Sequence, residues 1–379
     1  MNFELSQDHK VLQSAVRDFV EKEIKPIAMK IDEDHMIPDA LVKQMGEMGF
    51  LGSYLPEEYG GAGLDMLSYA IVVEEVSKAC GSSGVLISAH TSLCSGPIYT
   101  FGTEEQKKKW LPALNTGEKI GCFLLTEPDA GSDAGGTATT YKRDGDHYVI
   151  NGSKTFITNG GYLGTGVLLA SYDRSLKHKG ITAFIVDLSS PGVTILKNEN
   201  KMGIRGSYTT AFAFDDLRVP VENMLGQEGK GFNVAMDTLN GGRIGIASQA
   251  LGIAEGAFER ALAYSKERKQ FGQAISEFQA IQFKLADMWT SIETSKLLTY
   301  RAACLKDAKK SYTMESAMCK MHASETATFV TKEAIQIHGG YGYIVDYEVE
   351  RMYRDAKITE IYEGTNEVQR VVISKMLLS

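Results

Sequence analysis

The sequence has few of the features that mark secreted, metal-binding or membrane proteins. Its five cysteines (Cys80, Cys94, Cys122, Cys304 and Cys319) are scattered along 379 residues, without a CxxC pair or His/Cys ligand spacing. This argues against a disulfide framework and against a metal site such as zinc, and it predicts reduced thiols. No apolar run approaches the roughly 20 residues that span a bilayer.

Basic residues are not in excess either. The formal net charge of -8 argues against a general affinity for nucleic acid or for anionic membranes. A polyanionic ligand must therefore be met by local Arg and Lys groups. The N-terminal segment MNFELSQDHK is acidic and polar and leads into a helical pattern. We therefore expect no signal or transit peptide, and a cytoplasmic protein.

What the sequence does contain is a change of periodicity along its length. Residues 1–120 carry helical patterns, among them the segments 67–79 and 84–99. Residues 121–230 carry short apolar runs divided by Gly and Pro, which is typical of a small β-barrel or sandwich. Residues 231–379 are helical again. This order predicts an α+β protein of three domains, with a β domain between two helical ones.

An Asn-Gly pair predicts a hairpin within the β part. Asn151-Gly152 separates two short strand-like runs, 148–150 and 153–157, and this pair favours a type I′ turn. Further strand candidates are residues 122–125, 167–171, 181–188, 193–196 and 211–217.

The segment IYEGTNE near the C-terminus carries the first candidate catalytic residue. Glu363 stands between the bulky Tyr362 and Gly364, so we expect its backbone in a turn and its carboxylate free to point into a cleft. Thr365 or Asn366 can cap the apolar-periodic helix that follows, whose free N–H groups suit an anion. Taken alone, Glu363 is more simply interpreted as a solvated turn residue.

Five further segments combine glycine with polar, aromatic or basic residues. Residues 126–133 (TEPDAGSD) and 156–161 (FITNGG) can present hydroxyls and N–H groups to a polar ring or a phosphate, although such loops usually only make turns. Residues 336–342 (QIHGGYG) suit a glycine C-cap or a close approach to a nucleotide. Residues 268–272 (RKQFG) form a basic, aromatic helix terminus that can pair with a diphosphate. In residues 240–243 (NGGR), the glycines leave room for a flat ligand.

Six segments occur in one order along the chain: TEPDAGSD, FITNG, NGGRIGIASQALGIA, ERKQFG, QIHGGYG and IYEGTNEVQR. With them the whole chain resembles an acyl-CoA dehydrogenase, closest to the short-chain (butyryl-CoA) branch. The resemblance implies an N-terminal helical domain, a central β domain and a C-terminal four-helix domain. It also implies non-covalently bound FAD and a homotetramer built as a dimer of dimers.

The resemblance further implies which residues hold FAD. Residues implied to line the flavin from the β domain are Phe123, Leu125, Thr126, Ser132, Phe156, Ile157 and Thr158. Residues implied to meet the ADP half of an FAD in the neighbouring subunit are Arg268, Phe271, Gln279, Gln336, Ile337, Gly339 and Gly340. Residues implied to close over the diphosphate are Thr365, Asn366 and Glu367. Many relatives carry Trp at the position of Phe156. Phenylalanine keeps a flat apolar wall there, but it lacks the N–H donor of the indole. Dimerisation and FAD retention are therefore expected to be coupled.

The implied reaction is the α,β-desaturation of an acyl-CoA. Glu363 is implied to remove the α-proton, while flavin N5 receives the β-hydride. Hydrogen bonds to the thioester oxygen, from the backbone N–H of the base and a flavin ribitol hydroxyl, stabilise the developing enolate. A carboxylate base works best when burial raises its pKa toward neutrality. In some relatives the base comes from the NGGR helix, where the matching position is Gly242, which has no side chain to serve.

Substrate contacts are implied for Ser132, Asn240, Arg243, Tyr362 and Gly364. Many relatives carry Asp in place of Asn240. The same base and flavin work in both directions, so enoyl-CoA reduction is open too, with electrons exchanged with an electron-transferring flavoprotein. The alternatives are a branched, cyclic or aromatic acyl-CoA, an oxidase that reduces dioxygen directly, and a flavin subunit of an electron-bifurcating assembly.

Overall fold

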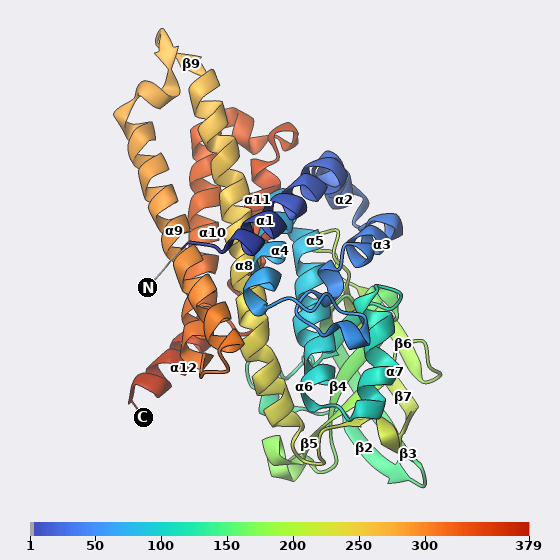
Figure 1. Cartoon of the computed structure of the whole chain (residues 1–379). Helices are drawn as coiled ribbons and strands as arrows, with labels where there is room; N and C mark the ends of the chain where they lie inside the picture. The colour runs from blue at the N-terminus through green and yellow to red at the C-terminus, as the bar shows by residue number, and fades with distance from the viewer. Residues whose placement is uncertain (1–3, 379) are drawn as a thin grey trace.

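The computed structural model describes residues 4–378, which run from helices through a β-sheet to helices again (Figure 1). This confirms the α+β class and the helical–β–helical order. The division at residues 1–120, 121–230 and 231–379 stays a prediction, because helices before and after the sheet share one hydrophobic core. Residues 1–3, part of the segment expected to lack a targeting peptide, lie outside the described residues. None of the helices in residues 4–378 combines the length and apolar character that a bilayer crossing requires.

The helices before the sheet pack on each other and on the later helices. The segment predicted over 84–99 is helical throughout, but it contains a π-helical turn at Ala89–Ser95 between two α-helical pieces. The helices are α1 (Gln7–Phe19), α2 (Ala28–Asp34), α3 (Asp39–Glu47), α4 (Met66–Ala79), α5 (Gly81–Ser88), α6 (Gly96–Phe101) and α7 (Glu104–Asn115).

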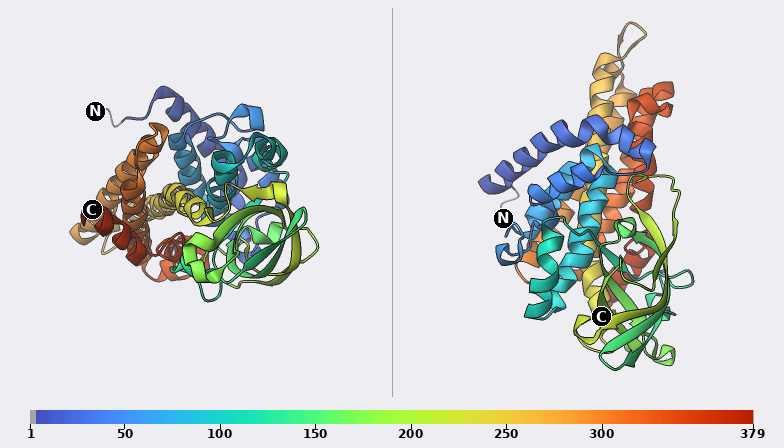
Figure 2. Two further views of the ribbon diagram at one scale, coloured as in Figure 1. Left: turned by 90° about the horizontal axis from the view of Figure 1, so that it is seen from below. Right: turned by 90° about the vertical axis from the view of Figure 1, so that its right-hand side faces the viewer.

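The β part is one sheet of eight strands in the order β6-β7-β3-β2-β4-β5-β8, with β1 pairing parallel to β4. It curls into a separate unit beside the helices, shown in green in both views of Figure 2. A core that includes Ile150, Phe184 and Phe212 fills its interior. The strands are β1 (Gly121–Leu124), β2 (Thr140–Asp144), β3 (His147–Thr158), β4 (Thr165–Ser171), β5 (Ile181–Asp187), β6 (Val193–Asn198), β7 (Thr209–Pro220) and β8 (Met224–Leu225).

The predicted Asn-Gly hairpin is wrong. Residues 148–157 belong to one strand, β3, and the chain reverses before it, where Gly145 has a φ of 62° between β2 and β3. At Gly152 the register against β7 shifts, and a Cβ there would lie 2.5 Å from the Oγ1 of Thr139. Asn151 accepts a hydrogen bond from the backbone N–H of Asp216 at 2.8 Å. The pair therefore forms a β-bulge in a long strand. Its glycine is needed because Thr139 approaches the backbone closely at this position.

The C-terminal helices are organised around α8 (Gly231–Glu267), which runs through the middle of the molecule in Figure 1 and packs against α4, α9 and α10. Its middle part is fully buried and contains small and branched residues such as Ala247, Leu251 and Ala254. The remaining elements are β9 (Lys269–Gln270), β10 (Gln273–Ala274), α9 (Gln279–Asp307), α10 (Thr313–His338), α11 (Val349–Ile358) and α12 (Asn366–Leu378).

Candidate active site

The turn between α11 and α12 has the backbone that the sequence predicted. Glu363 has a φ of 52° and Gly364 a φ of 91°, so a non-glycine residue is held in the left-handed region. Such strain persists where surrounding contacts enforce it, and it is frequent at functional sites. The side-chain amide of Gln369 donates to the carbonyl oxygens of Glu363 at 3.2 Å and of Gly364 at 2.8 Å. The hydroxyl of Thr365 accepts from the N–H of Val368 at 3.3 Å, which makes Thr365 the helix cap of the two candidates.

The carboxylate of Glu363 lies against the backbone of α8. A Cβ at Gly242 would stand 2.1 Å from Oε2 of Glu363 and 2.7 Å from the side chain of Leu93. The glycine is therefore required for the carboxylate to fit. Oε2 is buried and has no hydrogen-bond partner among residues 4–378. A buried carboxylate oxygen without a partner is costly, which makes Glu363 a candidate functional group.

The surroundings of Glu363 raise the pKa of its carboxyl group toward neutrality. Burial raises its pKa to about 8, while the charges of Lys320 and Arg243 oppose the rise. Arg243 is itself buried, and its Nη1 donates to Oδ1 of Asn240 at 2.8 Å, which brings two predicted substrate residues together. A carboxyl group that titrates near neutrality can both accept and return a proton under physiological conditions.

Tyr362 and Asn366 fix the two sides of the turn. The hydroxyl of Tyr362 donates to the side-chain oxygen of Gln249 on α8. The side-chain oxygen of Asn366 accepts from Lys320 on α10 at 3.1 Å, and Lys320 also donates to the carbonyl oxygen of Gly364 at 2.8 Å. Lys320 was not predicted as a site residue. The only signal for it in the sequence is a lysine among the small residues Ala317, Ser324 and Ala327 of α10.

The predicted flavin loop and the end of β3 lie side by side in the β part. The backbone N–H of Thr155 donates to the carbonyl oxygen of Thr126 at 2.9 Å, which joins the two segments. Phe156 has a φ of 58° and a side chain that is 63% exposed, whereas Ile157 is buried. An uncovered flat ring beside hydroxyl-bearing loops suits a flat cofactor that is partly apolar, so these residues fit FAD.

An unpredicted ion pair anchors this loop. Nζ of Lys154 on β3 is buried, and it donates to Oε1 of Glu127 at 2.7 Å and to the carbonyl oxygen of Leu125 at 3.0 Å. The same carboxylate accepts from the backbone N–H groups of Ala138 at 2.6 Å and Thr139 at 3.1 Å. One buried pair therefore fastens both ends of the segment that carries Thr126 and Ser132.

The residues predicted to meet the ADP half of the neighbouring subunit's FAD lie where α8 and α10 end and α9 begins. A pocket of about 530 Å³ is lined by Arg268, Ile337, Gly339 and Gly340, and the guanidinium of Arg268 lies 5.3 Å from the ring centroid of Tyr341. Gln279 and Gln336 are exposed. The predicted helix terminus at 268–272 is wrong in part, because α8 ends at Glu267 and β9 and β10 form a projecting hairpin (Figure 1).

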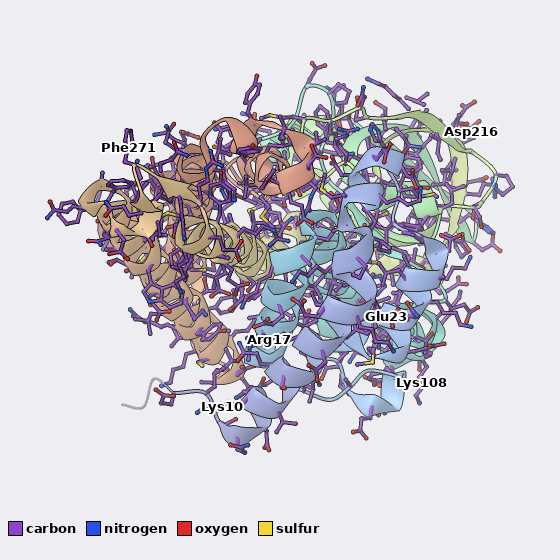
Figure 3. All side chains as sticks on the ribbon, turned by 90° about the horizontal axis from the view of Figure 1, so that it is seen from above. Lys10, Arg17, Glu23, Lys108, Asp216 and Phe271 are labelled. Carbon is purple, nitrogen blue, oxygen red and sulfur yellow. The ribbon has the colours of Figure 1, made fainter. Side chains whose placement is uncertain are left out.

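Phe271 stands at the tip of this hairpin. Its side chain is 94% exposed, and Figure 3 shows it at the edge of the molecule. Between Gly242 and Glu267, α8 rises by about 38 Å. Within one chain, the pocket at Arg268 and the carboxylate of Glu363 are therefore far apart.

The helical–β–helical fold, the carboxyl group of Glu363 with a pKa near neutrality and the exposed ring of Phe156 beside hydroxyl-bearing loops fit a flavin-dependent oxidoreductase. The family description "Acyl-CoA dehydrogenase, N-terminal domain" matches residues 6–118, the middle domain matches 122–217 and the C-terminal domain matches 229–378. The chain belongs to the acyl-CoA dehydrogenase family. This confirms the resemblance seen in the sequence, and it makes the chain an FAD-dependent oxidoreductase of CH–CH bonds.

Relatives and solved structures agree on this assignment. The chain is 56% identical to the short-chain specific acyl-CoA dehydrogenase of Clostridium acetobutylicum, with 99% of each chain covered. It is 52% identical to the human mitochondrial short-chain specific enzyme, covering 99% of this chain and 91% of that one. The structure of butyryl-CoA dehydrogenase from Megasphaera elsdenii has a TM-score of 0.98 at 48% identity, with both chains fully covered.

Two further solved structures extend the comparison. A chain from work titled "Electron transferring flavoprotein of Acidaminococcus fermentans: Towards a mechanism of flavin-based electron bifurcation" has a TM-score of 0.98 at 52% identity over the full length of both chains. An acyl-CoA dehydrogenase of Bacillus anthracis, solved in complex with FAD, has a TM-score of 0.93 at 38% identity, covering 99% of this chain and 67% of that one.

Proposed function

We propose that this enzyme desaturates a short-chain acyl-CoA to the trans-2-enoyl-CoA, or catalyses the reverse reduction, with Glu363 as the base. The observation that carries the proposal is the buried Oε2 of Glu363, which lies against Gly242 and has no hydrogen-bond partner within residues 4–378. Relatives named for short-chain and butyryl-CoA substrates support a short straight acyl chain over a branched, cyclic or aromatic one.

The side chains divide the work of this reaction. Glu363 accepts the α-proton on its carboxylate, and its backbone N–H is the proposed donor to the thioester oxygen. Bound FAD supplies the acceptor for the β-hydride. Arg243 offers a buried Nε without a partner in residues 4–378, and it bonds to Asn240, which supports these two residues as the proposed contacts for the pantetheine or nucleotide of CoA. Closure of the acyl chain over Glu363 excludes water, which strengthens these interactions.

Two copies of the chain are proposed to complete each FAD site, within a homotetramer. The separation of Arg268 from Glu363 and the extreme exposure of Phe271 support this arrangement. The residues assigned to the neighbouring copy's cofactor are Arg268, Phe271, Gln279, Gln336, Ile337, Gly339 and Gly340. An electron-transferring flavoprotein is the proposed redox partner, which the Acidaminococcus structure supports. The cytoplasm is the proposed location, and a bacterial relative supports it.

A substrate panel tests the proposal. The purified yellow protein is mixed anaerobically with acyl-CoAs of increasing length and with branched and aromatic ones, and bleaching of the flavin band is followed. Butyryl-CoA is expected to bleach fastest. Bleaching by branched or aromatic substrates alone would reject the short-chain assignment, and oxygen uptake at the rate of turnover would identify an oxidase.

The rate of bleaching is expected to depend on pH through Glu363. Only the ionised carboxylate accepts a proton, and burial raises the pKa of Glu363 to about 8. The rate with saturating butyryl-CoA should therefore rise between about pH 6 and 9 and then level off. Stopped-flow absorbance in buffers of constant ionic strength measures it. A rate that falls over the same interval would contradict the assignment of an ionised base.

Removing the guanidinium of Arg268 is expected to weaken FAD retention. In the Arg268→Ala variant, the pocket at the end of α8 loses its charge-assisted donor to a diphosphate. We expect more free FAD in the filtrate after ultrafiltration than for the parent protein. Lys266→Ala, which removes an exposed charge from the same helix end, is the control. Equal retention in Arg268→Ala would contradict the proposed diphosphate contact.

A further inference from the structure

The loop between β6 and β7, residues 199–208, lies against helices from both helical parts of the chain. A Cβ at Gly203 would stand 2.2 Å from the carbonyl oxygen of Arg354 on α11. A Cβ at Gly206 would stand 2.2 Å from Cγ2 of Ile31 on α2. Both glycines are therefore required for the loop to approach the two helices this closely. None of the residues assigned to FAD or to the substrate lies in this loop, so those assignments do not explain its close fit.

Ile204, in the middle of this loop, has a strained backbone. Its φ of 43° places a β-branched residue in the left-handed region, where such residues are rare. Its N–H donates to Oδ1 of Asp355 on α11, whose other oxygen lies 3.6 Å from Nη1 of Arg351. Its carbonyl oxygen accepts from the N–H of Ser207 at 3.0 Å. Contacts from α11 and from the loop itself therefore hold Ile204 in a conformation that costs free energy, as is frequent at functional sites.

The side chain of Ile204 is 2% exposed and belongs to a small apolar cluster that reaches the turn of Glu363. The buried members are Val85 on α5, Ile246 on α8 and Ile204 itself, and the partly buried Ile358 and Tyr362 pack against them. Tyr362 directly precedes Glu363, and its hydroxyl donates to the side-chain oxygen of Gln249 on α8. Tyr362 is therefore held in two ways, by a hydrogen bond to α8 and by packing on the cluster. Among these cluster residues, Ile204 alone comes from the β part.

We infer that Ile204 is a positioning residue, which holds Tyr362 and thereby keeps the turn of Glu363 in place for removal of the α-proton. The inference rests on Glu363 being the base. The β part also contains Phe156, the proposed flavin wall, so this contact fixes the base turn relative to the part of the chain that holds the cofactor. Because a displacement of about 1 Å can lower a rate about 10²-fold, loss of the Ile204 side chain should act on the reaction rate.

Ile204→Gly tests this role, because glycine adopts a positive φ without strain and so keeps the loop backbone while the side chain is removed. In the FAD-loaded variant, the rate of anaerobic bleaching at saturating butyryl-CoA should fall about tenfold or more. The butyryl-CoA concentration that gives half of the maximal rate should change less than about twofold. Ile204→Val, which keeps a branched side chain, should restore the parent rate. If Ile204→Gly does not fold, Ile204→Ala removes most of the same side chain.

Backbone amide exchange with D2O over residues 359–368, followed by mass spectrometry, reports on the turn without any reaction. Exchange there should be faster in Ile204→Gly than in the parent. Val219→Ala is the matched control, because Val219 is equally buried but lies in the separate core of the β part. It should lower the unfolding temperature and leave both the bleaching rate and this exchange unchanged.

Parent-like bleaching and exchange in a folded Ile204→Gly or Ile204→Ala would overturn the inference, as would an equal loss of rate in Val219→Ala. Failure of the proposed function is a different result, namely bleaching of Glu363→Gln at the parent rate. In that case amide exchange over residues 359–368 would still decide whether Ile204 holds the turn.

Discussion

Glu363→Gln is expected to slow anaerobic flavin bleaching by butyryl-CoA by about 10³-fold, within the range that a positioned general base contributes. The amide has nearly the same shape, so it fits against Gly242, but it cannot accept the α-proton. Because Oε2 has no hydrogen-bond partner in residues 4–378, the substitution breaks no observed contact of the carboxylate. Stopped-flow absorbance measures the rate, and the flavin spectrum of the purified variant reports FAD content.

Glu360→Gln is the comparison for this variant. Glu360 lies three residues earlier, and its carboxylate accepts from the hydroxyl of Thr328 at 2.5 Å and pairs with Lys357. It has contacts that occupy it, unlike Glu363, so its variant should bleach at close to the parent rate. FAD content and affinity for the enoyl-CoA product should be retained in both variants. Flavin reduction in Glu363→Gln at the parent rate would reject Glu363 as the base.

The order of elements was predictable because it depends on local periodicity. Helical stripes before residue 120 and after residue 231, and short apolar runs between them, are properties of adjacent residues. The hairpin at Asn151-Gly152 failed for the opposite reason. Its glycine is required by the approach of Thr139, which lies outside the segment, and β2 was missed because only Tyr141 of its five residues is buried.

The part of the candidate site that is formed by consecutive residues was predictable from the sequence. The turn at Glu363 followed from its neighbours Tyr362 and Gly364. Its protonation could not follow from them, because it depends on Lys320 from α10 and on the space that Gly242 leaves on α8. These contacts join parts of the chain that are distant in sequence. Similarity to a family supplies residue roles, but it does not show which neighbouring charges act on the pKa of a buried carboxyl group.

Lys154→Met is expected to cause the largest loss of stability among these variants, about 3–5 kcal/mol, the usual result of removing one partner of a buried ion pair. The carboxylate of Glu127 would remain buried, with the N–H groups of Ala138 and Thr139 but no cation. The link from Nζ to the carbonyl oxygen of Leu125 would also be lost. The segment that contains Thr126 should therefore loosen, and FAD should be released more readily.

Thermal unfolding with and without added FAD, together with FAD in the ultrafiltrate, measures both effects. Lys142→Met, an exposed lysine on the neighbouring strand β2, should leave both unchanged. Adding Glu127→Gln to Lys154→Met should recover part of the stability, because the buried negative charge is then absent. The loop would still lack its lysine anchor, so FAD retention should recover less than stability does. Parent-like unfolding and retention in Lys154→Met would show that the ion pair does not anchor the flavin loop.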